Sequence, residues 1–214
     1  MWEEDGEPGM LADGVYAELT LPYRFAQAAG NSSAAISAYT ASESCCALAF
    51  AEAGANGGSY IQPGWALPHL REQWREWLDS RPEIYDGLRS AAQVGVVYST
   101  QAAQLEDTEH LLAMYPVSRW LCEQQIPFDY LLDGNLSFEG YSVVIIPSVT
   151  YLTDGFLEKL SEYIESGGIA IAVGDVGEMD LNCQKRDSSQ ITEYLSGKEA
   201  RADGMTVATE GDGM

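Results

Sequence analysis

The sequence predicts an α/β fold, in which a parallel sheet between two layers of helices occupies the segment 92–177. Three apolar runs indicate it: Gln93–Tyr98 (QVGVVY), Ser142–Ile146 (SVVII) and Gly168–Val173 (GIAIAV). Runs of β-branched and small apolar residues without polar alternation are typical of strands buried on both faces. A segment with helical periodicity, Asp154–Ser166, joins the last two runs, and strand–helix–strand is the repeating unit of a parallel sheet.

The first ninety residues predict a shorter alternation of strands and helices. Met1–Gly14 is acidic and rich in glycine, and we expect a loop there. The segments that follow predict an extended piece leading into a helix, a buried strand, an alanine-rich helix and a short strand, in the order Val15–Ala29, Ala34–Tyr39, Glu43–Ala55 and Ser59–Gln62. Thr40 or Ser42 can cap the alanine-rich helix, and the turn at Asn56–Gly58 ends it.

Two helices rich in tryptophan and arginine come next. Pro68 and Pro82 each suit a first helical turn, which predicts helices over Leu70–Asp79 and Glu83–Ser90. Because these helices separate two strand-bearing regions, we interpret them as a connector, with a domain boundary near Gly87–Ala92. The expected domains are residues 1–90 and 91–180, followed by an irregular tail over 181–214.

The remaining elements of the second domain follow in order. Trp120 and Leu121 are expected to face inward from their helix. Thr153 or Asp154 can cap the helix before the last strand, and Gly167–Gly168 stops it. The other expected elements are a polar loop, a short helix, the helix that carries Trp120, a strand and a last short helix, at Ser99–Thr108, Glu109–Tyr115, Val117–Gln125, Asp129–Leu132 and Ile191–Leu195.

The chain is strongly acidic, with 33 Asp and Glu against 11 Lys and Arg and a formal net charge of −22. Nucleic acids and anionic membranes require a basic surface, so this balance argues against both as partners. Hydrophobic residues make up 46% of the chain, which is enough for a packed core. We interpret the charge as a solvated acidic surface, with an acidic patch for a cationic partner as the alternative.

The cysteines Cys45, Cys46, Cys122 and Cys183 predict free thiols. The adjacent pair suits neither a mutual disulfide nor a zinc site of the C-x-x-C type, so a reducing compartment is expected. No apolar run reaches the roughly 18 residues of a membrane span, and MWEEDGEPGM lacks the basic and apolar parts of a secretory signal. We therefore expect a cytoplasmic protein that binds no metal and no cofactor.

Several motifs, taken in order, resemble those of a known domain. QVGVVYST, PFDYLLDGNL, YSVVIIPSVTYLTDGFLEKLSEYIESGG and IAIAVGDVG are similar to the class I glutamine amidotransferase-like domain of family 42 glycoside hydrolases, called the β-galactosidase trimerisation domain. This resemblance implies a flavodoxin-like, three-layer parallel sheet over 91–180. The upstream sequence AISAYTASESCCALAFAEAGANGGSYIQPGW resembles the end of the (β/α) barrel in such enzymes, which implies that residues 1–90 are barrel-derived.

The carboxylates of the chain do not form a glycosidase site. A complete barrel takes about 200 residues or more, so only its final strands are expected here. Retaining glycosidases hold two carboxyl groups about 5–5.5 Å apart, on different strands. Glu43 and Glu52 are the carboxylates near the expected strands, and both lie on one helix without facing each other. Glu43 is interpreted as a first-turn residue that complements the helix dipole, and no catalytic residue is expected.

An active amidotransferase requires a cysteine on a sharp turn after a strand, with a histidine beside it. The resemblance places that turn at Gly174–Gly177, which contains no cysteine. Cys183 lies beyond the turn, in a polar segment. His69 and His110 come too early in the chain to match the expected partner. We therefore predict that the nitrogen-transfer activity is absent.

Two groups of residues are candidates for binding. Strand ends in parallel sheets form ligand crevices, and the polar residues at the expected strand ends are Ser99, Thr100, Asp133, Ser148, Thr150 and Asp175. No glycine-rich phosphate loop follows the first strand, and two carboxylates without a third ligand are more typical of turns than of a cation site. The aromatic residues Trp65, Trp74, Trp77 and Trp120 predict packing between domains or subunits, with carbohydrate stacking as the alternative.

Three functional hypotheses follow. The first is a non-catalytic domain that supports homo-oligomerisation, or a sugar site, in a glycoside hydrolase-like protein. The second is a piece of an active glycoside hydrolase whose catalytic carboxylates lie outside this chain. The third is an independent flavodoxin-like module that binds a small ligand.

Overall fold

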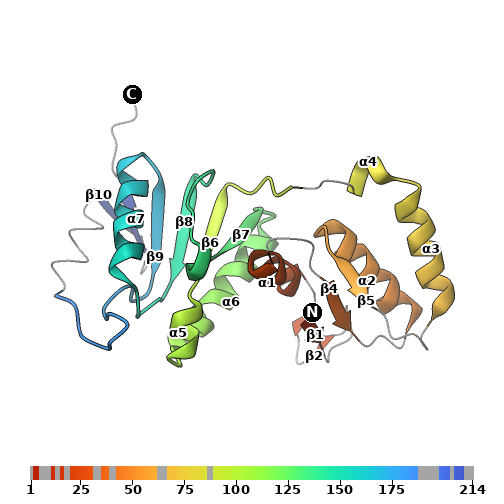
Figure 1. Ribbon diagram of the computed structural model, residues 1–214, viewed down its shortest axis with the longest axis horizontal. Helices are drawn as coiled ribbons and strands as arrows, with labels where there is room; N and C mark the ends of the chain where they lie inside the picture. The colour runs from red at the N-terminus through yellow and green to blue at the C-terminus, as the bar shows by residue number, and fades with distance from the viewer. Residues whose placement is uncertain are drawn as a thin grey trace. The chain divides into compact units, whose positions relative to one another are not determined.

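The structure is a computed structural model that describes residues 2–4, 11–12, 15–16, 20–30, 35–38, 42–61, 67–85, 89–187, 198–202 and 205–209. The chain forms two compact units, Met1–Ser90 and Ala91–Met214 (Figure 1). Trp65 and the helix expected over Ile191–Leu195 lie outside the described residues. Within the described residues, no helix combines the length and the apolar character needed to cross a bilayer.

Four parallel strands form the centre of the second unit (Figure 1). They are β6 (Val94–Tyr98), β7 (Phe128–Leu132), β8 (Val143–Pro147) and β9 (Ile169–Val173), in the spatial order β7-β6-β8-β9. The predicted strands are confirmed to within one residue at each end. The chain leaves β6 toward one edge of the sheet and leaves β8 toward the other, which makes the β6–β8 boundary the topological switch point.

Helices cover both faces of this sheet, because successive residues of a strand point to opposite sides. Leu131 of β7 belongs to the same core as Leu160 of α7 (Asp154–Glu165). The preceding residue, Tyr130, donates a hydrogen bond of 2.8 Å to Ser118 Oγ of α6 (Thr108–Glu123), on the other face. The three-layer arrangement predicted from the uninterrupted apolar runs is therefore confirmed.

The segment after β6 is more helical than the sequence predicted. Where a polar loop was expected, α5 (Thr100–Gln104) begins at once, because Ser99 Oγ accepts a hydrogen bond from the backbone N–H of Ala102 at 3.0 Å. One helix, α6, takes the place of the two short helices and runs through Pro116. The inward orientation predicted for Trp120 is wrong: this side chain is 52% exposed, whereas Leu121 is 2% exposed and faces the sheet.

A hairpin extends the sheet beyond β9. β10 (Lys198–Ala202) and β11 (Met205–Thr209) pair with each other, and β11 pairs antiparallel with β9. The sequence predicted an irregular tail here, because glycines, scattered charges and the acidic end of the chain interrupt the apolar pattern. The open edge of β9 supplies unpaired backbone groups, and this tertiary context overrides the weak local preference.

The first unit contains a three-stranded parallel sheet, in the order β1-β4-β5. Its elements are β1 (Trp2–Glu4), β2 (Leu11–Ala12), β3 (Val15–Tyr16), α1 (Thr20–Gly30), β4 (Ala35–Ala38), α2 (Glu43–Ala55), β5 (Ser59–Ile61), α3 (Pro68–Asp79) and α4 (Pro82–Tyr85). β1 and β2 lie where a loop was expected, and α4 is shorter than its predicted helix. Parallel strands that pair in chain order are the arrangement found in (β/α) barrels.

Tyr23 of α1 anchors the core of the first unit. Its side chain is fully buried with Ala49 and Ala53 of α2, and its hydroxyl donates a hydrogen bond of 3.2 Å to the carbonyl of Ser59 in β5. Burial, together with the nearby Glu52, raises the pKa of Tyr23, so the phenol keeps the proton that it donates. Ser42 caps α2 as predicted, through a hydrogen bond from the backbone N–H of Cys45 at 3.2 Å.

Because β6 and β7 are in close contact, one methyl group added between them should destabilise the fold. A Cβ atom on Gly95 would overlap the buried side chain of Leu131, so we expect Gly95→Ala to reduce the free energy of unfolding by about 1–3 kcal/mol. Gly155→Ala in α7 is the matched control, because a Cβ there meets no atom within 4 Å. Urea-induced unfolding followed by circular dichroism measures both changes. Equal stability of the two variants would contradict this account of the sheet.

Candidate functional site

The loops that follow β6 and β7 meet through the carboxylate of Asp133. Asp133 Oδ2 accepts hydrogen bonds from Ser99 Oγ at 2.8 Å and from the backbone N–H of Gln101 at 3.1 Å. Its Oδ1 accepts a hydrogen bond from Thr100 Oγ1 at 2.5 Å. Ser99, Thr100 and Asp133 are three of the six residues that the sequence placed at the strand ends, and the structure brings them together. The hydroxyl groups of Ser99 and Thr100 both donate to the carboxylate of Asp133.

The surroundings of Asp133 favour its charged form. Partial burial acts to raise the pKa of this carboxyl, but the hydrogen bonds from Thr100, Gln101 and Ser99 outweigh it and hold the pKa below its ordinary value. The negative charge is therefore stabilised by neutral hydrogen-bond donors from the start of α5. This cluster ties the end of β7 to the first turn of α5.

His110 joins the ends of β6 and β8 at the switch point, where it is fully buried. Its Nε2 accepts a hydrogen bond from the backbone N–H of Ser99 at 3.1 Å, and its Nδ1 lies 2.7 Å from the carbonyl oxygen of Pro147. A carbonyl can only accept, so Nδ1 carries the proton and the ring is neutral. Both ring nitrogens are occupied by the backbone, and neither is available as a catalytic base.

From the sequence, His110 was a candidate only as a partner for a thiolate, and its hydrogen bonds to the ends of β6 and β8 were not predicted. The signal that could have found it is its place in the first turn of α6, two residues after the helix begins. Asp107 caps that helix by accepting from the backbone N–H of His110 at 3.3 Å. The other carboxylate oxygen of Asp107 accepts from the backbone N–H of Thr150 at 3.0 Å, which attaches the loop after β8 to the same helix end.

The loops after β8 and β9 run side by side. The N–H of Ser148 donates to the carbonyl of Val173 at 2.6 Å, and the N–H of Gly177 donates to the carbonyl of Val149 at 2.7 Å. Ser148 has a left-handed backbone (φ 46°) and is 8% exposed. Of the remaining strand-end candidates, Thr150 joins this region through its backbone, and Asp175 is exposed.

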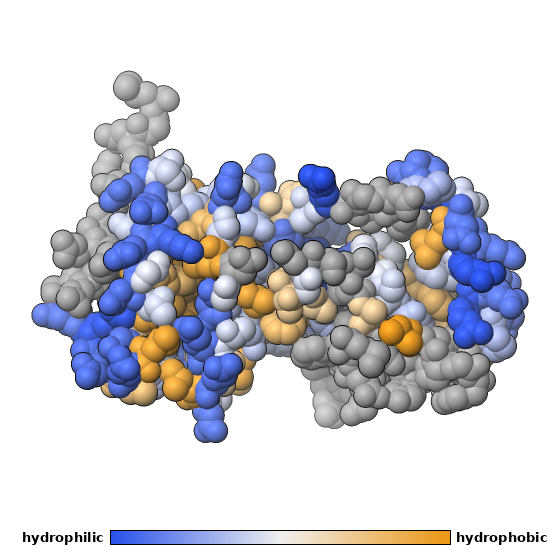
Figure 2. All heavy atoms as spheres, viewed as in Figure 1, coloured by the Kyte–Doolittle hydropathy of each residue, from blue (hydrophilic) through white to orange (hydrophobic). Residues whose placement is uncertain are grey.

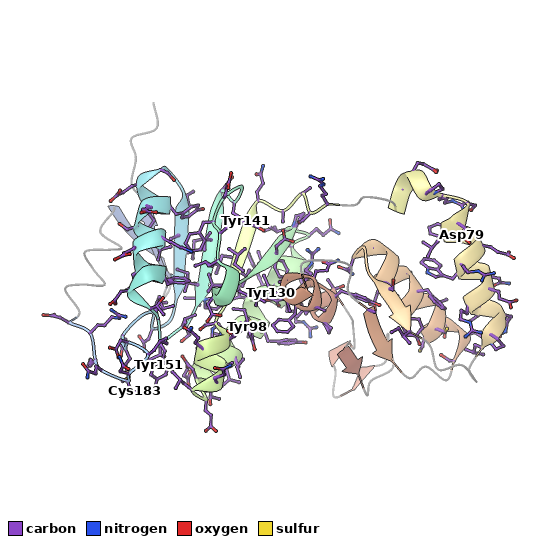
Figure 3. All side chains as sticks on the ribbon, viewed as in Figure 1. Asp79, Tyr98, Tyr130, Tyr141, Tyr151 and Cys183 are labelled. Atoms are coloured by element: carbon purple, nitrogen blue, oxygen red, sulfur yellow. The ribbon has the colours of Figure 1, made fainter. Side chains whose placement is uncertain are left out.

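Gly174 forms the sharp turn that the sequence analysis compared with a nucleophile position. Its φ of 74° is left-handed, and a Cβ atom there would lie 2.9 Å from Ser148 Oγ. A side chain at Gly174 would therefore require both a strained backbone and a shift of the Ser148 hydroxyl. Cys183 is exposed and lies on a separate turn, which Asp180 holds by accepting from the backbone N–H groups of Asn182 and Gln184 at 2.8 and 2.9 Å (Figure 3).

Two tryptophans of α3 stack on each other. The rings of Trp74 and Trp77 are 4.9 Å apart at 19°, and Phe50 of α2 stacks on Trp74 at 5.6 Å. The guanidinium of Arg81 covers Trp77 at 4.8 Å from the ring centre. Nearby, His69 Nε2 lies 3.2 Å from Glu43 Oε1, and both side chains are exposed.

An apolar stripe crosses the outer surface of α6. Leu112, Tyr115 and Trp120 are 62%, 45% and 52% exposed, and Pro116 between them is also exposed. These four residues, here called the α6 stripe, recur at helical spacing, so they lie on one side of the helix. In the described part of the chain, no cluster of three or more His, Cys, Asp or Glu residues has metal-binding geometry.

The lowered pKa of Asp133 predicts a defined dependence of stability on pH. A carboxyl whose pKa is lower in the folded chain stabilises the fold above its unfolded value, near 3.8, and this contribution is lost as the pH falls through the folded pKa. We therefore expect the wild type to lose more stability than Asp133→Asn between pH 5 and pH 3. Asp175→Asn, an exposed aspartate at the same sheet edge, is the control and should follow the wild type. Parallel urea titrations at each pH provide the measurement, and identical slopes for all three proteins would refute the role given to Asp133.

Solved structures with a similar fold are β-galactosidases. The chain superposes on the enzyme from Bacillus circulans sp. alkalophilus with a TM-score of 0.68 and 15% identity, over 91% of this chain and 35% of that one. For the enzyme from Rahnella sp. R3 the TM-score is 0.66 at 15% identity, over 87% of this chain and 34% of that one. The chain thus spans about a third of the length of these structures. No curated protein sequence matches it significantly.

A family model matches the second unit, and this match is more specific than the likeness to solved structures. Residues 91–195 match the model described as the beta-galactosidase trimerisation domain, and this range begins where the second unit begins. The parallel sheet of β6 to β9, with helices on both faces, lies entirely within it. Residues 91–195 of this chain are therefore identified as a β-galactosidase trimerisation domain, the segment that the family model matches.

Proposed function

We propose that this chain contributes a non-catalytic oligomerisation domain to a glycoside hydrolase-like protein, and that copies of the chain associate through the α6 stripe. The observation that carries the proposal is a row of exposed apolar side chains on a domain of the trimerisation family. Contiguous apolar surface on a protein marks an interaction site, because its burial is favourable and its exposure is costly.

The composition of the α6 stripe supports a specific contact between subunits. Trp and Tyr are enriched at the centres of protein interfaces, where they account for much of the binding energy. Trp120 and Tyr115 supply these side chains, and Leu112 supplies further apolar area. Arg119, which pairs with Glu123 at 3.0 Å, adds a charged group next to the stripe, as at the polar rim of an interface.

The absence of catalysis in the second unit forms part of the proposal. The turn Gly174–Gly177, where the resemblance places the nucleophile of an amidotransferase, contains no cysteine, and Gly174 at its start has a left-handed backbone. His110 is committed to the backbone and cannot activate a thiol. We further propose a cytoplasmic location, supported by the cysteines Cys45, Cys46, Cys122 and Cys183, none of which forms a disulfide.

The second proposed function is that of one piece of a glycoside hydrolase whose catalytic carboxylates lie outside this chain. Its support is the first unit, where parallel strands pair in chain order. Tyr60 of β5 packs against Phe50 of α2 at 4.8 Å, whereas Ser59 and Ile61, which point to the other face, are exposed. A barrel buries that face by closing the sheet on itself, which requires more strands.

The self-association of this chain is tested by light scattering coupled to size-exclusion chromatography. We expect the wild type to elute as a multiple of 23.3 kDa and the double variant Leu112→Ser/Trp120→Ser to shift toward 23.3 kDa. Loss of one central aromatic contact costs about 2 kcal/mol or more, so the dissociation constant should rise at least about 30-fold. Ile84→Ser is the control, since Ile84 is an apolar side chain of the first unit that is 49% exposed. A wild type that is monomeric at micromolar concentration would refute the proposal.

The second function is tested by the mass of the native polypeptide. An antibody raised against the second unit should detect, in the source cells, a band well above 23.3 kDa if this chain is part of a longer hydrolase. Hydrolysis of a chromogenic β-galactoside by the immunoprecipitated protein would then support the activity named for the similar structures. A native band at 23.3 kDa without hydrolysis would exclude this function and leave the oligomerisation test unaffected.

A further inference from the structure

Charged side chains lie at both ends of the apolar row on the outer surface of α6. Glu109 is exposed in the first turn of the helix, and Arg119, whose side chain is 37% exposed, lies near its end. Leu112 and Pro116 are exposed between them. Because these residues are spaced by three, four and three positions, they form one row along the same side of the helix. The row is acidic at its amino end, apolar in the middle and basic at its carboxyl end.

This row is symmetric about Met114. Leu112 and Pro116 lie two residues on either side of Met114, and Glu109 and Arg119 lie five residues on either side. At a rise of about 1.5 Å per residue, the two charged residues are each about 7.5 Å from the midpoint along the helix axis. A second α6 that lies antiparallel, with its midpoint level with the first, would therefore place its Arg119 beside Glu109 and its Pro116 beside Leu112. A twofold axis repeats each of these contacts, so both ends of the row are paired.

We propose that α6 of one copy of this chain packs antiparallel against α6 of a second copy. This pairing rests on the proposed association through the α6 stripe and identifies the surface that the stripe meets. In the pair, Leu112, Tyr115 and Pro116 of both copies form an apolar centre. An ion pair between Glu109 of one copy and Arg119 of the other lies at each end of this centre. The apolar centre supplies affinity, and the ion pairs select the direction of the helices.

Arg119 has hydrogen-bond donors available for a second carboxylate. Its Nε donates to Glu123 Oε1 at 3.0 Å, and its Nη1 donates to the hydroxyl of Tyr115 at 3.5 Å. These hydrogen bonds use two of the five N–H groups of the guanidinium. The bond to Glu123 also holds the side chain along the surface of α6, so less conformational freedom is lost when Glu109 of the second copy is bound.

The charges favour the antiparallel pair over a parallel one. A parallel pair in register would place Glu109 beside Glu109 and Arg119 beside Arg119, and like charges at close range repel. Antiparallel helices also oppose their dipoles, whereas parallel helices align them. Arg119 is the one Lys or Arg in α6, and at the contact it offsets part of the repulsion between two chains that each carry a net charge of −22. α7 presents a different surface, on which hydrophilic side chains dominate (Figure 2).

The test combines charge reversal with mixing of variants of the full chain, measured by light scattering coupled to size-exclusion chromatography. Glu109→Lys and Arg119→Glu each bring like charges together at both ends of the pair, so either variant should raise the dissociation constant by about tenfold or more. An equimolar mixture of the two should associate as the wild type does, because each contact between the different chains then joins opposite charges. The matched controls are Glu158→Lys and Lys159→Glu, at exposed positions of α7, which should change the dissociation constant by less than about twofold. Circular dichroism confirms that each variant is folded.

The mass of the wild type separates this pair from other modes of association. We expect an even multiple of 23.3 kDa, because a twofold contact joins copies in pairs. A mass of three copies would overturn the antiparallel pair and still support association through the α6 stripe, and so would charge-reversed variants that behave like the controls. A mixture that stays dissociated would show that Glu109 and Arg119 do not meet. A monomeric wild type would remove both the pair and the proposed function.

Discussion

The burial of β6 and β8 on both faces is the constraint on which the second unit depends. A strand covered on both sides has no position for an unpaired polar side chain, because each such group would lose its hydration without compensation. Polar chemistry is therefore confined to the ends of the strands. At the carboxyl ends it appears as hydrogen bonds that close the loops.

The closure at the carboxyl ends uses most of the groups that could act on a substrate. Asp133 accepts three hydrogen bonds from the start of α5. Both ring nitrogens of His110 are hydrogen-bonded to the backbone at the ends of the two central strands. Gly174 begins the turn after β9 with a left-handed backbone, and the turn Gly174–Gly177 contains no cysteine. Folds of this type have a ligand crevice at this end of the sheet, whereas here the polar groups hydrogen-bond the loops to one another. This arrangement agrees with an oligomerisation domain.

The outer surfaces of the two helix layers differ in chemistry. α6 presents the apolar row of Leu112, Tyr115, Pro116 and Trp120, whereas α7 presents mainly charged side chains. Burial of an apolar surface against another apolar surface is favourable, whereas charged side chains are stable in water. The two helix layers thus differ in the kind of contact that their outer surfaces favour.

The sequence by itself determined the strands β6 to β9 and the helix α7, because burial on both faces leaves uninterrupted apolar runs and an amphipathic helix leaves its period. It also placed Ser99, Thr100 and Asp133 at one sheet edge, since parallel strands end together. Only the tertiary structure decided that these residues bond to one another and that Trp120 faces outward. The hairpin on β9 likewise depends on contacts between segments far apart in the chain, and local residue preferences carry no record of such contacts.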